Sequence, residues 1–158
     1  MKGASADGLT RLFDERAIER LYVRYCELVD AKDFARLDEV FTPDTRGDYT
    51  QALGEGVVTE GLAMLVAAME ANLGAGSHCG ATHHNVTNFD IAVEGDAATA
   101  QVHYIAAHAG VGALAGRHYT MWGEYDDHLV RTEEGWRVSE RIYTLAVATG
   151  DPAVVAGG

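Results

Sequence analysis

Basic residues are scarce in this sequence, and long apolar runs are absent. Twelve lysines and arginines stand against 24 aspartates and glutamates, which gives a formal net charge of −12. An acidic surface of this kind repels phosphate backbones and anionic lipids, so we expect neither a nucleic-acid partner nor a membrane partner. The longest strongly apolar stretch, residues 62–69, is far shorter than the roughly 20 residues that a membrane-spanning helix needs.

Cysteines are also few. Cys26 and Cys79 are the only two, which is too few for a disulfide framework. The N-terminal residues MKGASADGLTRLF contain no apolar segment of the kind found in secretory signals. Together these features predict reduced thiols and a cytoplasmic location.

Several catalytic signatures are missing as well. The sequence has no nucleophile elbow, no phosphate-binding glycine loop, no dinucleotide fingerprint and no CxxC pair. Histidines do gather in the segment SHCGATHH, residues 77–84, but the spacing HC-x3-HH matches no common structural zinc site. We therefore expect chemistry that needs neither a cofactor nor a metal.

The first half of the chain has a helical period. Asp14 is a suitable N-cap for a helix that runs to about residue 30, and Asp33 for a short second helix that Pro43 would end. A third helix is predicted after Thr59, ending in the glycines at 74 and 76. No repeat or linker interrupts the 158 residues, so we expect one domain over residues 1–158 with its core at about 14–150.

The second half of the chain changes to a period of two, which is typical of strands. Strands are predicted around 89–93, 98–108, 118–131 and 136–148, with a tight turn at 94–96, a loose glycine-rich connection at 110–116 and a frayed tail after 150. Helices followed by antiparallel strands predict an α+β fold. We expect a cone-shaped barrel, in which a curved, mainly antiparallel sheet wraps around the long N-terminal helix and leaves a cavity, with two further helices.

Asp30 is a candidate functional residue because of its position. It lies at the C-terminal end of the first predicted helix, where exposed carbonyl groups disfavour a carboxylate by up to about 1 kcal/mol. A solvated helix end is one interpretation. The other is a carboxylate that faces the cavity, orients a histidine and stabilises its protonated form.

The pattern does not choose between the two neighbouring candidate histidines. Simple alternation places His83 on the same face as Phe89, but a bulge near Asn88 would place His84 there instead. His108 continues the apolar face of its strand and is the better placed of the later histidines. Seven tyrosines offer phenol hydroxyls, of which we expect one or two to contribute to a site.

Three segments resemble one known family. They are AIERLYVRYCELVDAKDFARLDEVFTPD, THHNVTNFDIAVEGDAATA and YTMWGEYDDHLVRTEEGWRVSER. Together they are similar to the SnoaL-like family of the nuclear transport factor-like superfamily, over about residues 14–150. Within it they resemble the branch of scytalone dehydratase and bile-acid 7α-dehydratase, and also the dehydrochlorinase that acts on hexachlorocyclohexane. The resemblance implies a conical α+β fold with an apolar pocket.

The resemblance also implies residue roles. An aspartate at the end of the first helix pairs with a histidine in an H-x-x-x-N segment, which corresponds to Asp30 and His84 here and favours His84 over His83. The remaining implied positions are Tyr25 and His108 as further catalytic residues, with Tyr49, Asn88, Tyr104 and Trp122 as substrate-binding residues.

The implied activity is that of a cofactor-free lyase, most simply a dehydratase. The expected substrate is a hydrophobic cyclic or polycyclic hydroxy-carbonyl compound of polyketide-like or steroid-like type. His84 would remove the proton beside the carbonyl, and Tyr25, Tyr49 or His108 would polarise the carbonyl or protonate the departing hydroxyl. An isomerase or cyclase with the same residue pair, or a binding module without catalysis, is the alternative, because the superfamily contains all of these. The dehydrochlorinase has a lysine at the position of Tyr25, which argues against that activity.

Assembly into a homo-oligomer is also expected. A small domain with a broad apolar sheet commonly buries one face of the sheet against another subunit. The dehydratases that the sequence resembles are trimers, so a trimer is favoured over a dimer.

Overall fold

The fold is known from a computed structural model that describes residues 6–157. The chain begins with the long helix α1 (Ala6–Asp30) and the 3-10 helix η1 (Phe34–Glu39). These are followed by β1 (Phe41–Asp48), α2 (Thr50–Leu53), β2 (Val58–Glu60), α3 (Leu62–Leu73), β3 (Cys79–Glu94), β4 (Ala97–Gly110), η2 (Gly112–Leu114), β5 (His118–Thr132), β6 (Gly135–Gly150) and η3 (Pro152–Val155). None of the helices in this described range is long and apolar enough to cross a membrane.

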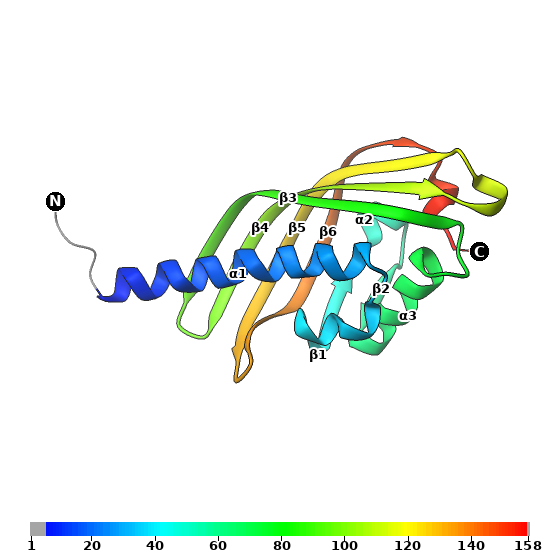
Figure 1. Cartoon of the computed structure of the whole chain (residues 1–158). Coiled ribbons are helices and arrows are strands. Elements are labelled where there is room, and N and C mark those ends of the chain that lie inside the picture. Colours follow the sequence, from blue (N-terminus) through cyan, green and yellow to red (C-terminus); the bar gives the residue numbers. More distant parts are fainter. Residues whose placement is uncertain (1–5, 158) are drawn as a thin grey trace.

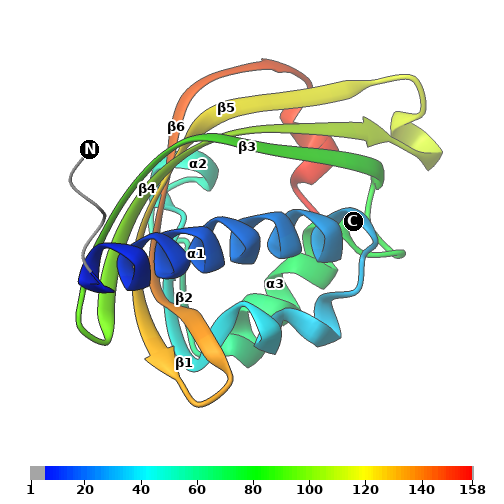
Figure 2. The ribbon, with the colours of Figure 1, turned by 60° about the vertical axis from the view of Figure 1, so that its left-hand side comes forward.

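Six strands form one curved sheet in the order β2-β1-β6-β5-β4-β3. All neighbouring strands are antiparallel except β1 and β6, which are parallel. The sheet curves over α1, and α3 lies at the same side of it (Figures 1 and 2). The α+β prediction is therefore confirmed, with one correction. The sheet is open and not a barrel, because β2 and β3 form its two edges in the part of the chain described.

Helix α1 begins earlier than predicted. Its first described residue is Ala6, so Asp14 lies inside the helix and is not its N-cap. The Asp14 carboxylate instead accepts hydrogen bonds from Nη1 and Nη2 of Arg131, each at 2.8 Å, and from Nε1 of Trp136 at 3.2 Å. The apparent capping residue is thus a long-range contact between α1 and the hairpin of β5 and β6.

The first half of the chain is less helical than predicted. Pro43 does not end a helix but lies within β1, where the pairing with β6 is irregular between Phe41 and Arg46. Proline is tolerated at such an irregularity because it has no N–H to donate to the neighbouring strand. The short elements α2 and β2 were also not predicted. Asp33 does precede η1, but its side chain makes no capping hydrogen bond.

The third helix and the long strands match their predictions closely. Helix α3 follows Gly61 and ends before Gly74, where a side-chain Cβ would lie only 2.4 Å from the carbonyl oxygen of Glu70. The turn at 94–96 connects β3 to β4, and β5 and β6 form the predicted second pair.

A bulge interrupts β3. Thr87 pairs with His103 and Asp90 with Gln101, so two residues of β3, Asn88 and Phe89, lie opposite one residue of β4. Asn88 has a φ of 52°, a left-handed conformation that asparagine tolerates better than most residues. Since side chains alternate along a strand, the extra residue changes which side chains before it face the core.

The C-terminal segment is ordered against the fold, so the prediction of a frayed tail is wrong. Residues 152–155 form η3, in which Val154 and Val155 are buried. Asp151 begins this turn: its Oδ1 accepts a hydrogen bond from the backbone N of Ala153, and its Oδ2 pairs with Arg117. Two apolar side chains that would otherwise be exposed provide the driving force for docking.

The core contains a fully buried ion pair between Arg141 of β6 and Asp127 of β5. Arg141 donates from Nε to Oδ1 at 3.0 Å and from Nη2 to Oδ2 at 2.7 Å, and both side chains are 0% exposed. Tyr22 of α1 donates its hydroxyl to the same carboxylate at 2.8 Å. The guanidinium also lies 4.0 Å from the ring centroid of Tyr125 and 4.5 Å from that of Tyr25. This network joins α1 to the sheet.

We expect the replacement Asp127→Asn to reduce the free energy of unfolding by about 3–5 kcal/mol, because it leaves the charge of Arg141 buried without a counter-ion. Denaturant titration measures this directly. The double variant Asp127→Leu with Arg141→Met should lose much less, since no charge remains in the core. As a control, Glu15→Gln at the exposed Arg11–Glu15 pair should change stability by no more than about 0.5 kcal/mol. An equal effect of Asp127→Asn and Glu15→Gln would contradict the argument.

Candidate active site

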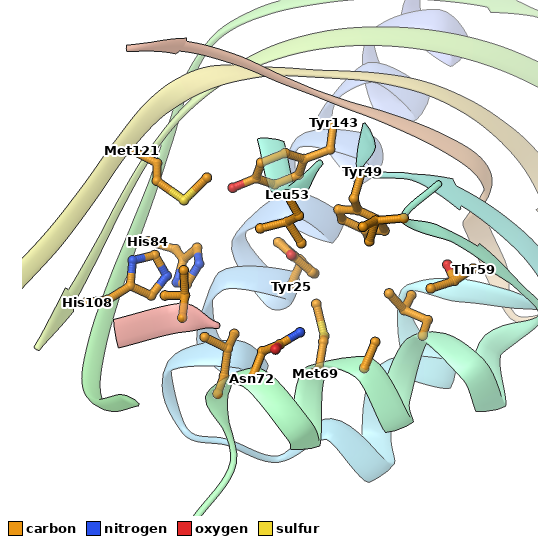
Figure 3. Close-up of a pocket in the computed structure, with 15 residues that line it drawn as sticks. Tyr25, Tyr49, Leu53, Thr59, Met69, Asn72, His84, His108, Met121 and Tyr143 are labelled. Atoms are coloured by element: carbon orange, nitrogen blue, oxygen red, sulfur yellow. The ribbon is translucent and has the colours of Figure 1, made fainter. Parts of the chain in front are cut away.

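A mainly apolar cavity of about 100 Å³ lies between the sheet and the helices α1 and α3. Figure 3 shows the side chains around it. They come from α1, α2, α3, five strands, η3 and the segments that flank α2: Tyr25, Tyr49, Leu53, Val57, Thr59, Leu65, Ala68, Met69, Asn72, Leu73, His84, His108, Met121, Tyr143 and Val155. The predicted pocket is therefore present, and four of the eight predicted site residues line it.

Asp30 is the last residue of α1, and its carboxylate contacts β3 through three hydrogen bonds. Oδ1 lies 2.7 Å from Nδ1 of His84 and accepts a bond from the hydroxyl of Thr82 at 2.9 Å, while Oδ2 accepts from the backbone N of His84 at 3.0 Å. Burial alone would raise the pKa of this carboxyl. The hydrogen bonds from His84 and Thr82, together with the electrostatic effect of His84, lower the pKa and outweigh the effect of burial. The net effect is a lowered pKa. Asp30 is therefore a carboxylate near neutral pH.

His84 is the histidine that faces the cavity, because the bulge at Asn88 places it on the core side of β3. Its side chain is 5% exposed, whereas that of His83 is 75% exposed and lies with Nδ1 3.7 Å from Asp30. A carboxylate only accepts hydrogen bonds, so the Nδ1 of His84 carries a proton. The Nε2 is then the nitrogen available to the cavity. The structure thus brings Asp30 and His84 together.

His108 lies beside His84. The two ring centroids are 5.6 Å apart and the rings are perpendicular (Figure 3). The Nδ1 of His108 lies 3.0 Å from the backbone carbonyl oxygen of Tyr119, the residue opposite it on the neighbouring strand β5. Burial, followed by the nearby charge of His84, lowers the pKa of His108 to about 4. His108 is therefore uncharged near neutral pH.

Three tyrosines contribute to the cavity wall. Tyr25 of α1 is buried with its ring edge-on to His84, and burial raises the pKa of its phenol to about 12. Burial also raises the pKa of Tyr49 and of Tyr143, whose rings are 5.4 Å apart. The hydroxyl of Tyr49 has no hydrogen-bond partner among the residues described. All three are phenols, and so hydrogen-bond donors, at physiological pH.

Three residues predicted to bind substrate do not line the cavity. Asn88 is exposed at the bulge, with its amide near His103. Trp122 faces the opposite side of the sheet from its neighbour Met121, because successive side chains of a strand alternate. There it lies in register with Ile105 and Val147.

Tyr104 is the third of these residues, and it lies one layer behind the wall. Its ring packs against Tyr125 and Tyr143, with centroids 4.7 and 4.6 Å apart, and its hydroxyl donates to the carbonyl of Thr144 at 2.8 Å. Its contribution is to support Tyr143.

Several cavity residues were not predicted from the sequence. Tyr143 lies on β6 between two register shifts, at which one extra residue of β6 interrupts the alternation. Met121 lies on β5, where buried side chains alternate regularly, so the period of two could have identified it. Val155 was missed because the tail was expected to be frayed. The helical period did expose Met69, and Asn72 lies one turn beyond it.

Across residues 6–157 there is no group of three or more histidine, cysteine, aspartate or glutamate side chains that could hold a metal ion.

Comparison with known proteins identifies the family. The SnoaL-like domain family matches residues 10–142, and the chain belongs to it. It is 30% identical over 137 residues to the uncharacterized protein Rv2910c of Mycobacterium tuberculosis, which covers 86% of this chain and 88% of that relative. Among solved structures it resembles the Kfla4162 protein of Kribbella flavida, with 28% identity, a TM-score of 0.82 and coverage of 92% and 98%.

A further solved structure has the same fold. It is a candidate scytalone dehydratase from Novosphingobium aromaticivorans, with a TM-score of 0.79, 22% identity and coverage of 90% of each chain. At this identity the likeness concerns the fold alone. The resemblance found in the sequence is confirmed at the level of the family.

The lowered pKa of His108 predicts a pH dependence of stability. The unfolded chain binds a proton at this residue below its ordinary pKa of 6.5, whereas the folded protein does so only below about 4. Stability should therefore be full above pH 6.5 and fall as the pH decreases toward 4, by roughly 3 kcal/mol.

Denaturant titrations across this pH range measure the effect. The variant His108→Leu should show a flatter pH dependence, whereas the control His128→Leu, which removes an exposed imidazole, should keep the wild-type slope. An unchanged slope in His108→Leu would show that His108 does not resist protonation.

Proposed function

We propose that the protein is a cofactor-free lyase of the dehydratase type, in which His84 is the base and Asp30 orients it. The observation that carries the proposal is the 2.7 Å contact between Oδ1 of Asp30 and Nδ1 of His84, with the imidazole at the wall of a mainly apolar cavity. A carboxylate behind an imidazole fixes the tautomer and stabilises the imidazolium that forms when the ring takes a proton.

The reaction begins at the carbon beside a carbonyl group. The Nε2 of His84 removes a proton from this carbon, and the electron pair moves toward the carbonyl to form an enolate. The Asp30 carboxylate stabilises the positive charge on the ring. A cavity with little water strengthens this interaction because the local dielectric is low.

The tyrosines provide donors for the enolate oxygen. Tyr25 borders the same cavity as His84, and burial raises the pKa of its phenol to about 12, so it keeps its proton at neutral pH. Tyr143 and Tyr49 also line this cavity. In the second step the enolate re-forms the carbonyl, the bond between the β-carbon and its hydroxyl breaks, and His84 returns its proton to that oxygen. The products are an unsaturated carbonyl compound and water, and the protein ends in its starting protonation state.

The proposed substrate is a hydrophobic, cyclic hydroxy-carbonyl compound. Leucine, valine, methionine and alanine side chains supply more than half of the lining residues, and tyrosine rings, the two histidines, Thr59 and Asn72 complete the wall.

An isomerase or cyclase is the second candidate. Within the described residues, His84 is the group in the cavity that is both backed by a carboxylate and able to take up a proton. The same proton could return to a carbon atom instead of to a hydroxyl oxygen. Product mass separates the two reactions, since dehydration removes a water molecule and isomerisation does not.

A test of proton abstraction does not require the natural substrate. Cyclic ketones incubated with the wild-type protein in deuterium oxide should exchange hydrogen for deuterium beside the carbonyl, as measured by NMR or mass spectrometry. We expect His84→Ala and Asp30→Asn to slow this exchange by about 10²–10⁴-fold, the usual contribution of a positioned general base.

The neighbouring histidine provides the matched control. His83→Ala removes an exposed imidazole that also lies near Asp30, and it should leave the exchange rate close to that of the wild type. Undiminished exchange in His84→Ala would refute the role of His84. No exchange with any ketone in the wild-type protein would favour a ligand-binding module without catalysis. Hydroxy-ketones of the same ring systems then test for loss of water.

A further inference from the structure

The two histidines of the cavity have different hydrogen-bond acceptors at Nδ1. A carboxylate, that of Asp30, lies behind His84, whereas a backbone carbonyl, that of Tyr119, lies behind His108. In both cases the bond uses Nδ1. The Nε2 atoms of both rings have no hydrogen-bond partner among the described residues, and both rings line the cavity.

The carbonyl of Tyr119 determines the tautomer of His108. A carbonyl oxygen only accepts hydrogen bonds, so a bond with Nδ1 requires the proton to be on Nδ1. An uncharged imidazole has one ring proton, which leaves Nε2 as a bare acceptor. The contact joins residues that face one another in the register of β4 and β5, so the backbone of the sheet maintains this arrangement.

The two acceptors differ in their ability to become charged. His84 gains a stabilising carboxylate when it takes up a proton. His108 has only a neutral dipole behind it, is 5% exposed, and lies 5.6 Å from a second imidazole whose positive charge would oppose its own. His84 can therefore act as a base, whereas His108 remains an uncharged acceptor throughout a reaction in this cavity.

We propose that His108 is a specificity-determining residue that accepts a hydrogen bond from a hydroxyl group of the ligand. This role differs from that of an acid, because a bare Nε2 has no proton to give. The hydroxyl that it holds is not the leaving group, because a departing oxygen gains negative charge and needs a hydrogen-bond donor, whereas the bare Nε2 can only accept. The inference rests on the proposed function in one respect, namely that this cavity is the ligand site.

The apolar surroundings give the acceptor its selectivity. A ligand without a hydroxyl at this position would leave Nε2 desolvated and unpaired, which weakens binding. The substrate class therefore narrows to hydroxy-carbonyl compounds that retain a second hydroxyl after water has left.

Phenol and anisole are suitable probes for this inference. Both have a single ring, which keeps the probes small for a cavity of about 100 Å³, less than the volume of about 150 Å³ in an apolar cavity that accepts benzene. Phenol can donate a hydrogen bond, whereas the ether oxygen of anisole can only accept one. The ratio of their dissociation constants, measured by ligand-observed NMR for each variant, isolates the contribution of the donor.

We expect His108→Leu to lower the preference for phenol over anisole by roughly three- to ten-fold relative to the wild type, the value of one net hydrogen bond. His108→Gln, which can place an acceptor oxygen near the position of Nε2, should restore part of the preference. His84→Leu removes the other bare Nε2 of the cavity, so its effect shows how much of the preference comes from His84 and how much from His108. The opposite result, a preference lost in His84→Leu and kept in His108→Leu, would overturn the proposal.

A second measurement uses the wild-type protein and so does not depend on whether a variant folds. In ¹⁵N-histidine-labelled protein, the Nε2 of His108 should resonate as an unprotonated nitrogen at neutral pH and shift when phenol is added. A protonated Nε2 would overturn the proposal. Neither measurement involves turnover, so a failure of the deuterium-exchange test leaves this inference standing, and a failure here leaves the roles of Asp30 and His84 standing.

Discussion

The buried ion pair of Arg141 and Asp127 is the constraint on which the rest of the structure depends. Two charges in an apolar core are tolerated only when their geometry and hydrogen bonding are closely satisfied. Here Asp127 and Arg141 lie opposite one another on the neighbouring strands β5 and β6, and the hydroxyl of Tyr22 on α1 donates to the same carboxylate, which holds α1 against the sheet. The guanidinium also packs against the ring of Tyr25, which lines the cavity, so the same pair defines the wall behind the candidate site.

At the other end of the cavity, the end of α1 is fixed by Asp30. The carboxylate there opposes the partial negative charge of the helix terminus, which by itself disfavours ionisation. Three donors from β3, namely the ring and backbone nitrogens of His84 and the hydroxyl of Thr82, outweigh this effect and burial. A carboxylate at an unfavourable helix position is thus stabilised by contacts that exist only in the folded protein, so its ionisation also contributes to the stability of the fold.

The sequence predicts elements whose causes are local and fails where the partner is distant. The third helix and the long strands follow from periodicity and from glycines that a side chain could not replace, such as Gly74. Asp14 has the local features of an N-cap, but its partner is Arg131, more than 100 residues away in the chain. Arg141 and Asp127 are only 14 residues apart and lie on a predicted pair of strands, but charged residues are not expected at core positions, so the pattern did not show that both face the core.

The choice between His83 and His84 illustrates the same limit within the candidate site. His83 and His84 are adjacent, so the choice between them depends on which face of β3 turns toward the core, and periodicity gives that face only to within one residue. The bulge at Asn88 settles it: one extra residue places Phe89 and His84 on the same side, although their separation of five residues would place them on opposite sides of a regular strand. Asn88 was predicted to contact the substrate. Its position in the structure indicates a different contribution, since by adopting a left-handed conformation it allows the shift that directs His84 toward Asp30 and the cavity.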